Sequence, residues 1–165
     1  MLHGKWVIAA GLFAAVIIFP AAHAQNSTSS DNMIKRVIDL QKQLLQASEE
    51  NIRALSTFQF NLQQGAICID DIDNINDDVS DHISRIVALY VSLSIKDESI
   101  KTFILSNLKD QLDSLLGDLA LKRKRLNIDA TRICGSVPLI VTRARVTESL
   151  LEEIERSIST LSKRY

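Results

Sequence analysis

The sequence predicts an all-α protein: an antiparallel up-down-up-down four-helix bundle that follows a cleaved signal peptide. Apolar residues recur in steps of three and four along four long stretches, which is the spacing of amphipathic helices. Residues 25–165 hold only three glycines and one proline, so few breakers divide this segment. Its 141 residues are enough for one domain with its own core.

Residues 1–24 carry the features of an export signal. Lys5 precedes an apolar run over residues 6–19, Pro20 ends that run, and Ala22-His23-Ala24 is a small-x-small cleavage site. We expect cleavage before Gln25 and a periplasmic or secreted mature protein of residues 25–165. The alternative is an uncleaved anchor, but fourteen apolar residues are fewer than the roughly 20 that span a bilayer.

The first helix is expected over residues 33–64. A Ser/Asp cluster at residues 29–31 offers its N-cap, and Gly65 its C-terminal stop. The predicted apolar stripe consists of Ile34, Val37, Ile38, Leu45, Ile52, Leu55 and Leu62.

The second and third helices form the central hairpin. The second is expected to begin inside Asp70–Asp73, with a stripe of Ile72, Ile75, Val79, Ile83, Ile86, Tyr90 and Leu93. Asp97 is expected to cap the third, whose stripe is Ile100, Ile104, Leu108, Leu112, Leu115, Leu119 and Leu126. The third helix reaches the basic run 122–125, and Gly117 inside it predicts a close helix crossing.

The fourth helix has the most regular pattern. Residues 127–136 are the least helical stretch, and Gly135 to Pro138 indicates a stop followed by a new first turn. The stripe then consists of Ile140, Ala144, Thr147, Leu151, Ile154, Ile158, Leu161 and Tyr165. Such a seam fits the core of one chain or a homodimer, because a heptad does not specify which chain it faces.

Cys68 and Cys134 are the only cysteines. An exported chain enters an oxidising compartment, so we predict one intramolecular disulfide between them. Cys68 falls between the first and second predicted helices and Cys134 between the third and fourth, so an up-down-up-down bundle places both at one end. The bond would stabilise the fold by roughly 4 kcal/mol. Two buried free thiols or an intermolecular bridge are the alternatives.

The acidic run over residues 70–81 is the one candidate cation site. Compared with an EF-hand loop that begins at Asp71, Ile75, Asn76 and His82 occupy positions that need an oxygen ligand, glycine and glutamate. We instead expect this run to sit at the positive N-terminal end of the second helix and to face the basic run 122–125. His82 with Asp78 supplies too few ligands for a metal, so no metal or cofactor is predicted.

No catalytic motif accompanies the many serines, so we expect a protein that is not an enzyme. The net charge of −1 becomes −2 once Lys5 is removed, which argues against nucleic acid as a partner. Phe58 and Phe60 lie about 200° apart on a helix, so one of them is expected to be exposed and to contact a partner. The predicted function is protein–protein interaction, as an inhibitor or immunity-type protein, an adaptor or a secretion-apparatus component. The alternative is a small-molecule or metal-sensing bundle.

Overall fold

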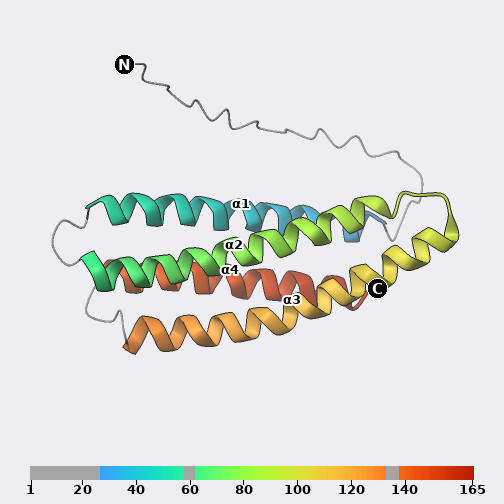
Figure 1. The fold of residues 1–165 in the computed structure, drawn as a ribbon. Helices are drawn as coiled ribbons and strands as arrows, with labels where there is room; N and C mark the ends of the chain where they lie inside the picture. Colours follow the sequence, from blue (N-terminus) through green and yellow to red (C-terminus); the bar gives the residue numbers. More distant parts are fainter. Residues whose placement is uncertain (1–26, 58–61, 133–137) are drawn as a thin grey trace, which may run out of the picture.

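The computed structural model describes residues 27–57, 62–132 and 138–165, which form four helices and no strand. The helices are α1 (Ser27–Thr57), α2 (Leu62–Ser92), α3 (Glu98–Arg132) and α4 (Pro138–Ser162). Successive helices run in opposite directions, side by side along their length (Figure 1). The all-helical four-helix bundle is therefore confirmed. Residues 1–24, Phe58, Phe60 and Cys134 lie outside the described residues.

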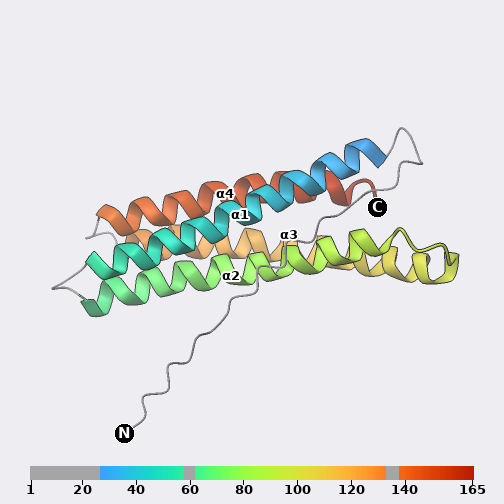
Figure 2. The same cartoon turned by 90° about the horizontal axis from the view of Figure 1, so that it is seen from above.

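The four helices form a ring in chain order. Helix α1 packs against α2 and α4, and α3 packs against the same two helices from the other side (Figures 1 and 2). Helix α2 also reaches α4 across the diagonal, whereas the described residues of α1 and α3 do not touch each other. Helices α2 and α4 are thus the inner pair, and α1 and α3 lie at opposite outer edges.

The core follows the predicted stripes most closely in α2 and α4. All seven stripe residues that lie within α4 are buried: Ile140, Ala144, Thr147, Leu151, Ile154, Ile158 and Leu161. In α2 the stripe is buried from Ile72 to Ile86, and Tyr90 and Leu93 pack against its end. The seam of α4 therefore faces the core of its own chain.

Helix α1 differs from its prediction in length and in register. It begins at Ser27, before the expected cap, and its described part ends at Thr57. Leu45 and Ile52 are 46% and 62% exposed, and the core positions belong instead to Leu40, Leu44 and Ala47. Seven residues turn an α-helix about 20° short of two full turns, so a strict seven-residue spacing drifts away from a straight neighbour. The predicted stripe contains Leu45 and Ile52 at this seven-residue spacing, so it turns away from the core.

The start of α2 and the end of α3 were also predicted wrongly. Helix α2 begins at Leu62, so Gly65 and Cys68 lie inside the helix, and the acidic run begins more than two turns after its start. The helix dipole therefore does not explain that run. Helix α3 continues to Arg132, through part of the stretch predicted to be least helical. Gly117 faces solvent, and a Cβ there would meet nothing within 4 Å, so no close crossing occurs.

Asp97 caps α3 as predicted. Its Oδ1 accepts hydrogen bonds from the backbone N–H groups of Ser99 at 2.9 Å and Ile100 at 3.3 Å. The Ser99 hydroxyl donates to the same oxygen at 2.6 Å, and these bonds hold the pKa of Asp97 below its usual value. Across residues 27–57, 62–132 and 138–165, none of the helices has the length and apolarity needed to cross a membrane.

Candidate interaction surface

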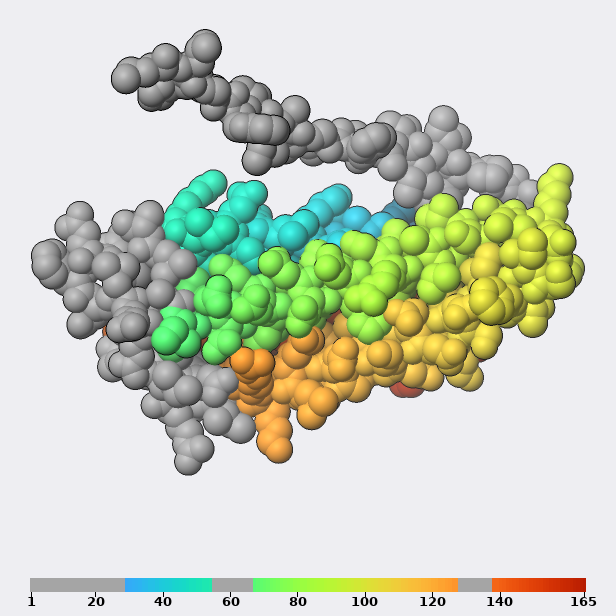
Figure 3. All heavy atoms as spheres, viewed as in Figure 1, coloured from blue at the N-terminus to red at the C-terminus, as the bar shows by residue number. Residues whose placement is uncertain are grey.

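The α2–α3 hairpin extends beyond the ends of α1 and α4 (Figures 1 and 2). Four apolar side chains are exposed there, Val91, Ile95, Ile100 and Phe103, and together we call them the hairpin tip. Phe103 is 69% exposed. The space-filling view shows this end of the molecule protruding as a blunt lobe (Figure 3). A cluster of exposed large apolar residues is typical of surfaces that bind another molecule.

The tip is built on a short, hydrogen-bonded turn. The backbone N–H of Leu93 donates to the Tyr90 carbonyl at 3.1 Å, and that of Ile95 to the Ser92 carbonyl at 3.2 Å. The Asp97 cap then starts α3, and Ile100 and Phe103, three residues apart, lie on one face of its first turns. Turn and cap therefore define the backbone that carries these apolar side chains.

The two described chain ends are fastened just below the tip. The Tyr90 hydroxyl donates to Asp31 Oδ1 at 2.5 Å, which ties α2 to the first turns of α1. Arg164, after the end of α4, donates to the hydroxyls of Ser29 at 2.5 Å and Ser30 at 3.4 Å. Burial, followed by the bond to Asp31, raises the pKa of Tyr90 well above its ordinary value, so this hydroxyl stays a donor.

The α1–α2 interface contains buried polar side chains. Asn51 Nδ2 donates to Asp73 Oδ1 at 2.8 Å, and Asn76 Nδ2 to Ser48 Oγ at 3.1 Å. Gln41 adds a bond of 2.9 Å to a backbone carbonyl of α2. Burial raises the pKa of Asp73 in spite of the bonds that it accepts. Polar pairing therefore joins apolar packing in setting the position of α1 against α2.

The acidic run of α2 and the basic run of α3 face each other, as the sequence predicted. Lys122 Nζ lies 3.0 Å from Asp78 Oδ2, and Arg125 Nη2 lies 2.9 Å from Asp71 Oδ1. Two carboxylates of the candidate cation site are thus already engaged by basic side chains. Among the residues that the structure describes, no three His, Cys, Asp or Glu side chains gather as a metal site would require.

His82 of α2 points toward α3 and is 8% exposed. Its Nδ1 is 3.8 Å from Asp118 Oδ2, whereas its buried Nε2 has no hydrogen-bond partner. Burial first, and the charge of Arg85 second, lower the pKa of His82, which keeps the imidazole neutral near pH 7.

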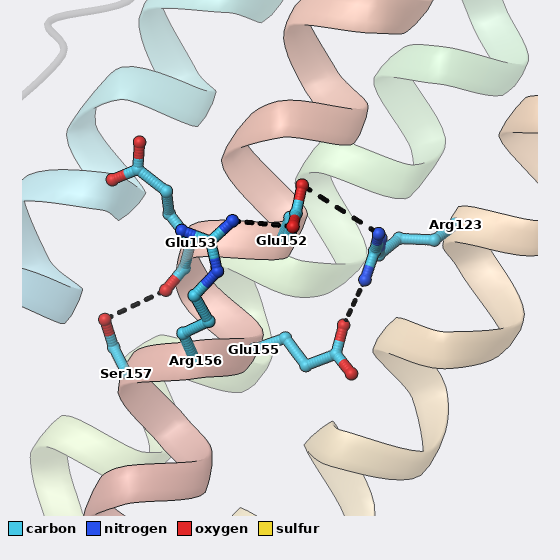
Figure 4. A network of polar contacts seen from close by, with 6 residues as sticks. All are labelled: Arg123, Glu152, Glu153, Glu155, Arg156 and Ser157. Atoms are coloured by element: carbon cyan, nitrogen blue, oxygen red, sulfur yellow. Dashed lines mark hydrogen bonds and ion pairs between the residues drawn. The ribbon is translucent and has the colours of Figure 1, made fainter.

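Charged side chains also join α3 to α4 (Figure 4). Arg123 of α3 reaches Glu155 Oε2 at 2.6 Å and Glu152 Oε2 at 4.0 Å, and Arg156 contacts Glu152 Oε1 at 2.6 Å. The hydrogen bond from Arg156, followed by its charge, lowers the pKa of Glu152. Glu152 and Glu155 are thus both paired with arginine, and the contacts of Arg123 connect α3 to α4.

A shallow hollow of about 250 Å³ lies between α1 and α4, lined by Glu50, Arg53, Ala54, Leu139 and Arg143. The ion pair between Arg143 and Glu50 crosses it and lowers the pKa of Glu50. This hollow is smaller and more open than the pockets that usually bind small molecules. The hairpin tip is therefore the stronger candidate site in the described part of the chain.

Sequence reasoning did not find the hairpin tip. Ile100 was assigned to the core stripe of α3, but it is 45% exposed because no part of α1 or α4 covers that turn. The sites predicted at Phe58, Phe60 and Cys134 fall outside the described residues, and Cys68 is buried in α2. Comparison of the chain with family models, curated proteins and solved structures finds no match in any of the three.

Proposed function

We propose that this protein is an exported, non-enzymatic helical bundle that binds another protein through its hairpin tip. The observation that carries the proposal is the overhanging α2–α3 hairpin, which exposes Ile100 and Phe103 on a fixed backbone. Aromatic side chains in such positions often provide the largest single contributions to binding. An inhibitor or immunity-type protein, an adaptor and a secretion-apparatus component would all use such a surface.

The start of the bundle supports export. Helix α1 begins at Ser27, two residues after Gln25, where we predict cleavage to leave the new N-terminus. Cleavage there would remove no residue of the described helices. The anchor alternative would leave the same bundle tethered through residues 1–24.

The position of Cys68 supports the predicted disulfide. Cys68 is buried in the second turn of α2, at the end of the bundle where α3 ends and α4 begins (Figure 1). In the sequence, Cys134 falls between Arg132, where α3 ends, and Pro138, where α4 begins. Mass spectrometry of the exported protein without reductant should show a chain lighter by two hydrogens than the reduced form, and an unchanged mass would refute the bond.

Affinity capture with tip variants tests the binding proposal. The purified protein, immobilised and incubated with periplasmic extract of the source organism, should retain a specific protein. Phe103→Ser should abolish that retention. Leu121→Ser is the matched control, because Leu121 is also on α3, apolar and 68% exposed, but lies away from the tip.

Both variants should fold normally, since exposed positions usually change stability by less than about 0.5 kcal/mol. Retention of no protein under mild conditions would refute the proposed function. Retention that survives Phe103→Ser, or that Leu121→Ser abolishes equally, would refute the tip as the binding surface.

A further inference from the structure

Helix α1 has an exposed face of its own. Ile38, Leu45 and Ile52 are spaced by seven residues and therefore follow one edge of the helix. Leu45 and Ile52 are 46% and 62% exposed, and Ile38 is partly buried against the core. With Lys42 and Glu49, which lie between them, we call these residues the α1 outer face. Helix α1 itself lies at an outer edge of the bundle and does not contact α3 (Figures 1 and 2).

The charges on this face have an ordered arrangement. Asp39 and Lys42 precede Leu45, and Glu49 and Arg53 follow it, so the signs run minus, plus, apolar, minus, plus. Lys42 is 3.4 Å from Asp39 and Arg53 is 3.7 Å from Glu49. All four side chains are at least 60% exposed, and such intrahelical pairs contribute only a few tenths of a kcal/mol. Lys42 and Glu49 can therefore turn toward a neighbouring molecule at little cost.

When this order of charges is read in the opposite direction, each negative charge falls opposite a positive one. When a second copy of α1 lies antiparallel with Leu45 opposite Leu45, Lys42 meets Glu49 of the second copy and Asp39 meets Arg53 of the second copy. The two-fold axis repeats each contact, as in every isologous interface. Parallel alignment would place like charges side by side. We propose that two copies of this protein associate through their α1 outer faces, antiparallel, with Leu45 and Ile52 as the apolar centre and Lys42–Glu49 as the pair that sets the register.

The interface should be weak and reversible. It uses one face of one helix, which is below the size of an obligate dimer interface. Asp77 and Asp81 of α2 are exposed and lie beside α1, because neighbouring positions of α2 bond to Gln41. The two copies of this acidic edge face each other and repel. A dissociation constant in roughly the micromolar range follows.

The inference adds to the proposed function without using the hairpin tip. An antiparallel pair of α1 helices places the two tips at opposite ends of the dimer, so each remains accessible. A dimer of this form can bind two partner molecules at once. Dimerisation and tip binding can therefore fail independently, and the experiments separate them.

Charge reversal followed by sedimentation equilibrium tests the dimer. Lys42→Glu makes both members of the register pair acidic, and Glu49→Lys makes both basic, so each variant should raise the dissociation constant at least about tenfold. The double variant Lys42→Glu/Glu49→Lys should regain dimerisation. An equimolar mixture of the two single variants should form heterodimers, because an acidic pair on one copy then meets a basic pair on the other. Lys109→Glu, a charge reversal on the opposite edge in α3, should have no effect.

Circular dichroism of each variant confirms that the helices are intact. A protein that stays monomeric at hundreds of micromolar would overturn the proposal. So would single variants that dimerise normally, or a mixture of folded single variants that stays monomeric. Loss of the dimer in Phe103→Ser would place the dimer interface at the tip and would equally overturn it.

Discussion

Replacing His82 by leucine should stabilise the protein, and more so in mild acid. The buried Nε2 has no partner, and a buried polar group left without one costs about 1–3 kcal/mol. Leucine removes that cost but also loses the contact with Asp118, at 3.8 Å and half-exposed on the carboxylate side, and the imidazole's hydrogen bond with the Gln111 backbone. We therefore expect a net gain of about 1 kcal/mol at pH 7, or about 3 °C in Tm for a domain of this size.

The pH dependence follows from the sign of the pKa shift. The fold lowers the pKa of His82 from its ordinary value of 6.5, so the unfolded chain takes up the proton first. The contribution of His82 to the free energy of unfolding is constant above about pH 6.5. It falls as pH drops toward the lowered pKa, by at most about 1.4 kcal/mol per pH unit for one proton. His82→Leu abolishes this loss, so its advantage over the unchanged protein should grow between pH 7 and pH 5.

Urea unfolding followed by circular dichroism at pH 5, 6 and 7 measures both effects. Asp118→Asn is the control, because the charge of Asp118 favours the protonated imidazole and its removal should steepen the acid loss. Arg85 and Lys122 stay in place and continue to oppose protonation. A leucine variant less stable than the unchanged protein at pH 7, or a difference constant across the three pH values, would refute this account of His82.

Three further substitutions should have distinct effects in the same unfolding assay. Asp73→Asn should stabilise the protein above neutral pH, because the raised pKa of Asp73 means that folding opposes its ionisation, whereas an amide stays neutral. The amide oxygen can still accept the hydrogen bond from Asn51. The difference in unfolding free energy between variant and unchanged protein should be larger at about pH 8 than at about pH 4, and the same difference at both would contradict this. Tyr90→Phe removes the bond to Asp31 and should cost about 0.5–1.5 kcal/mol, and an unchanged midpoint would show that the bond contributes nothing. Leu151→Ala, at a fully buried position of α4, should cost about 2–5 kcal/mol, and a cost below about 1 kcal/mol would mean that this layer of the core is not close-packed.

The sequence specifies α2 and α4 well because their apolar residues alternate steps of three and four with little interruption. In α1 the pattern fails because part of its contact with α2 is polar. Gln41, Ser48 and Asn51 are polar positions in α1, and each bonds to a residue of α2. A polar side chain reveals that role only when its partner on another helix is known.

The hairpin tip could not be predicted for a different reason. Exposure of Ile100 and Phe103 depends on how far α2 and α3 extend past α1 and α4, which is a property of the assembled bundle. The predicted start of α2 was wrong for a local reason. Gly65 was expected to end the first helix, but it lies inside α2. One glycine costs a helix roughly 1 kcal/mol, which is small beside the packing of a long helix.

Ser29 bonds to Arg164 and Asp31 bonds to Tyr90, and these contacts matter for how the protein is tagged or immobilised. Both ends of the described chain lie at the tip end of the bundle. A purification tag, a fluorescent domain or a surface linker attached to either described end would therefore crowd the tip and could mask the binding that we propose for it. An attachment point toward the opposite end of α3, for example at position 124, would leave the tip open to solution.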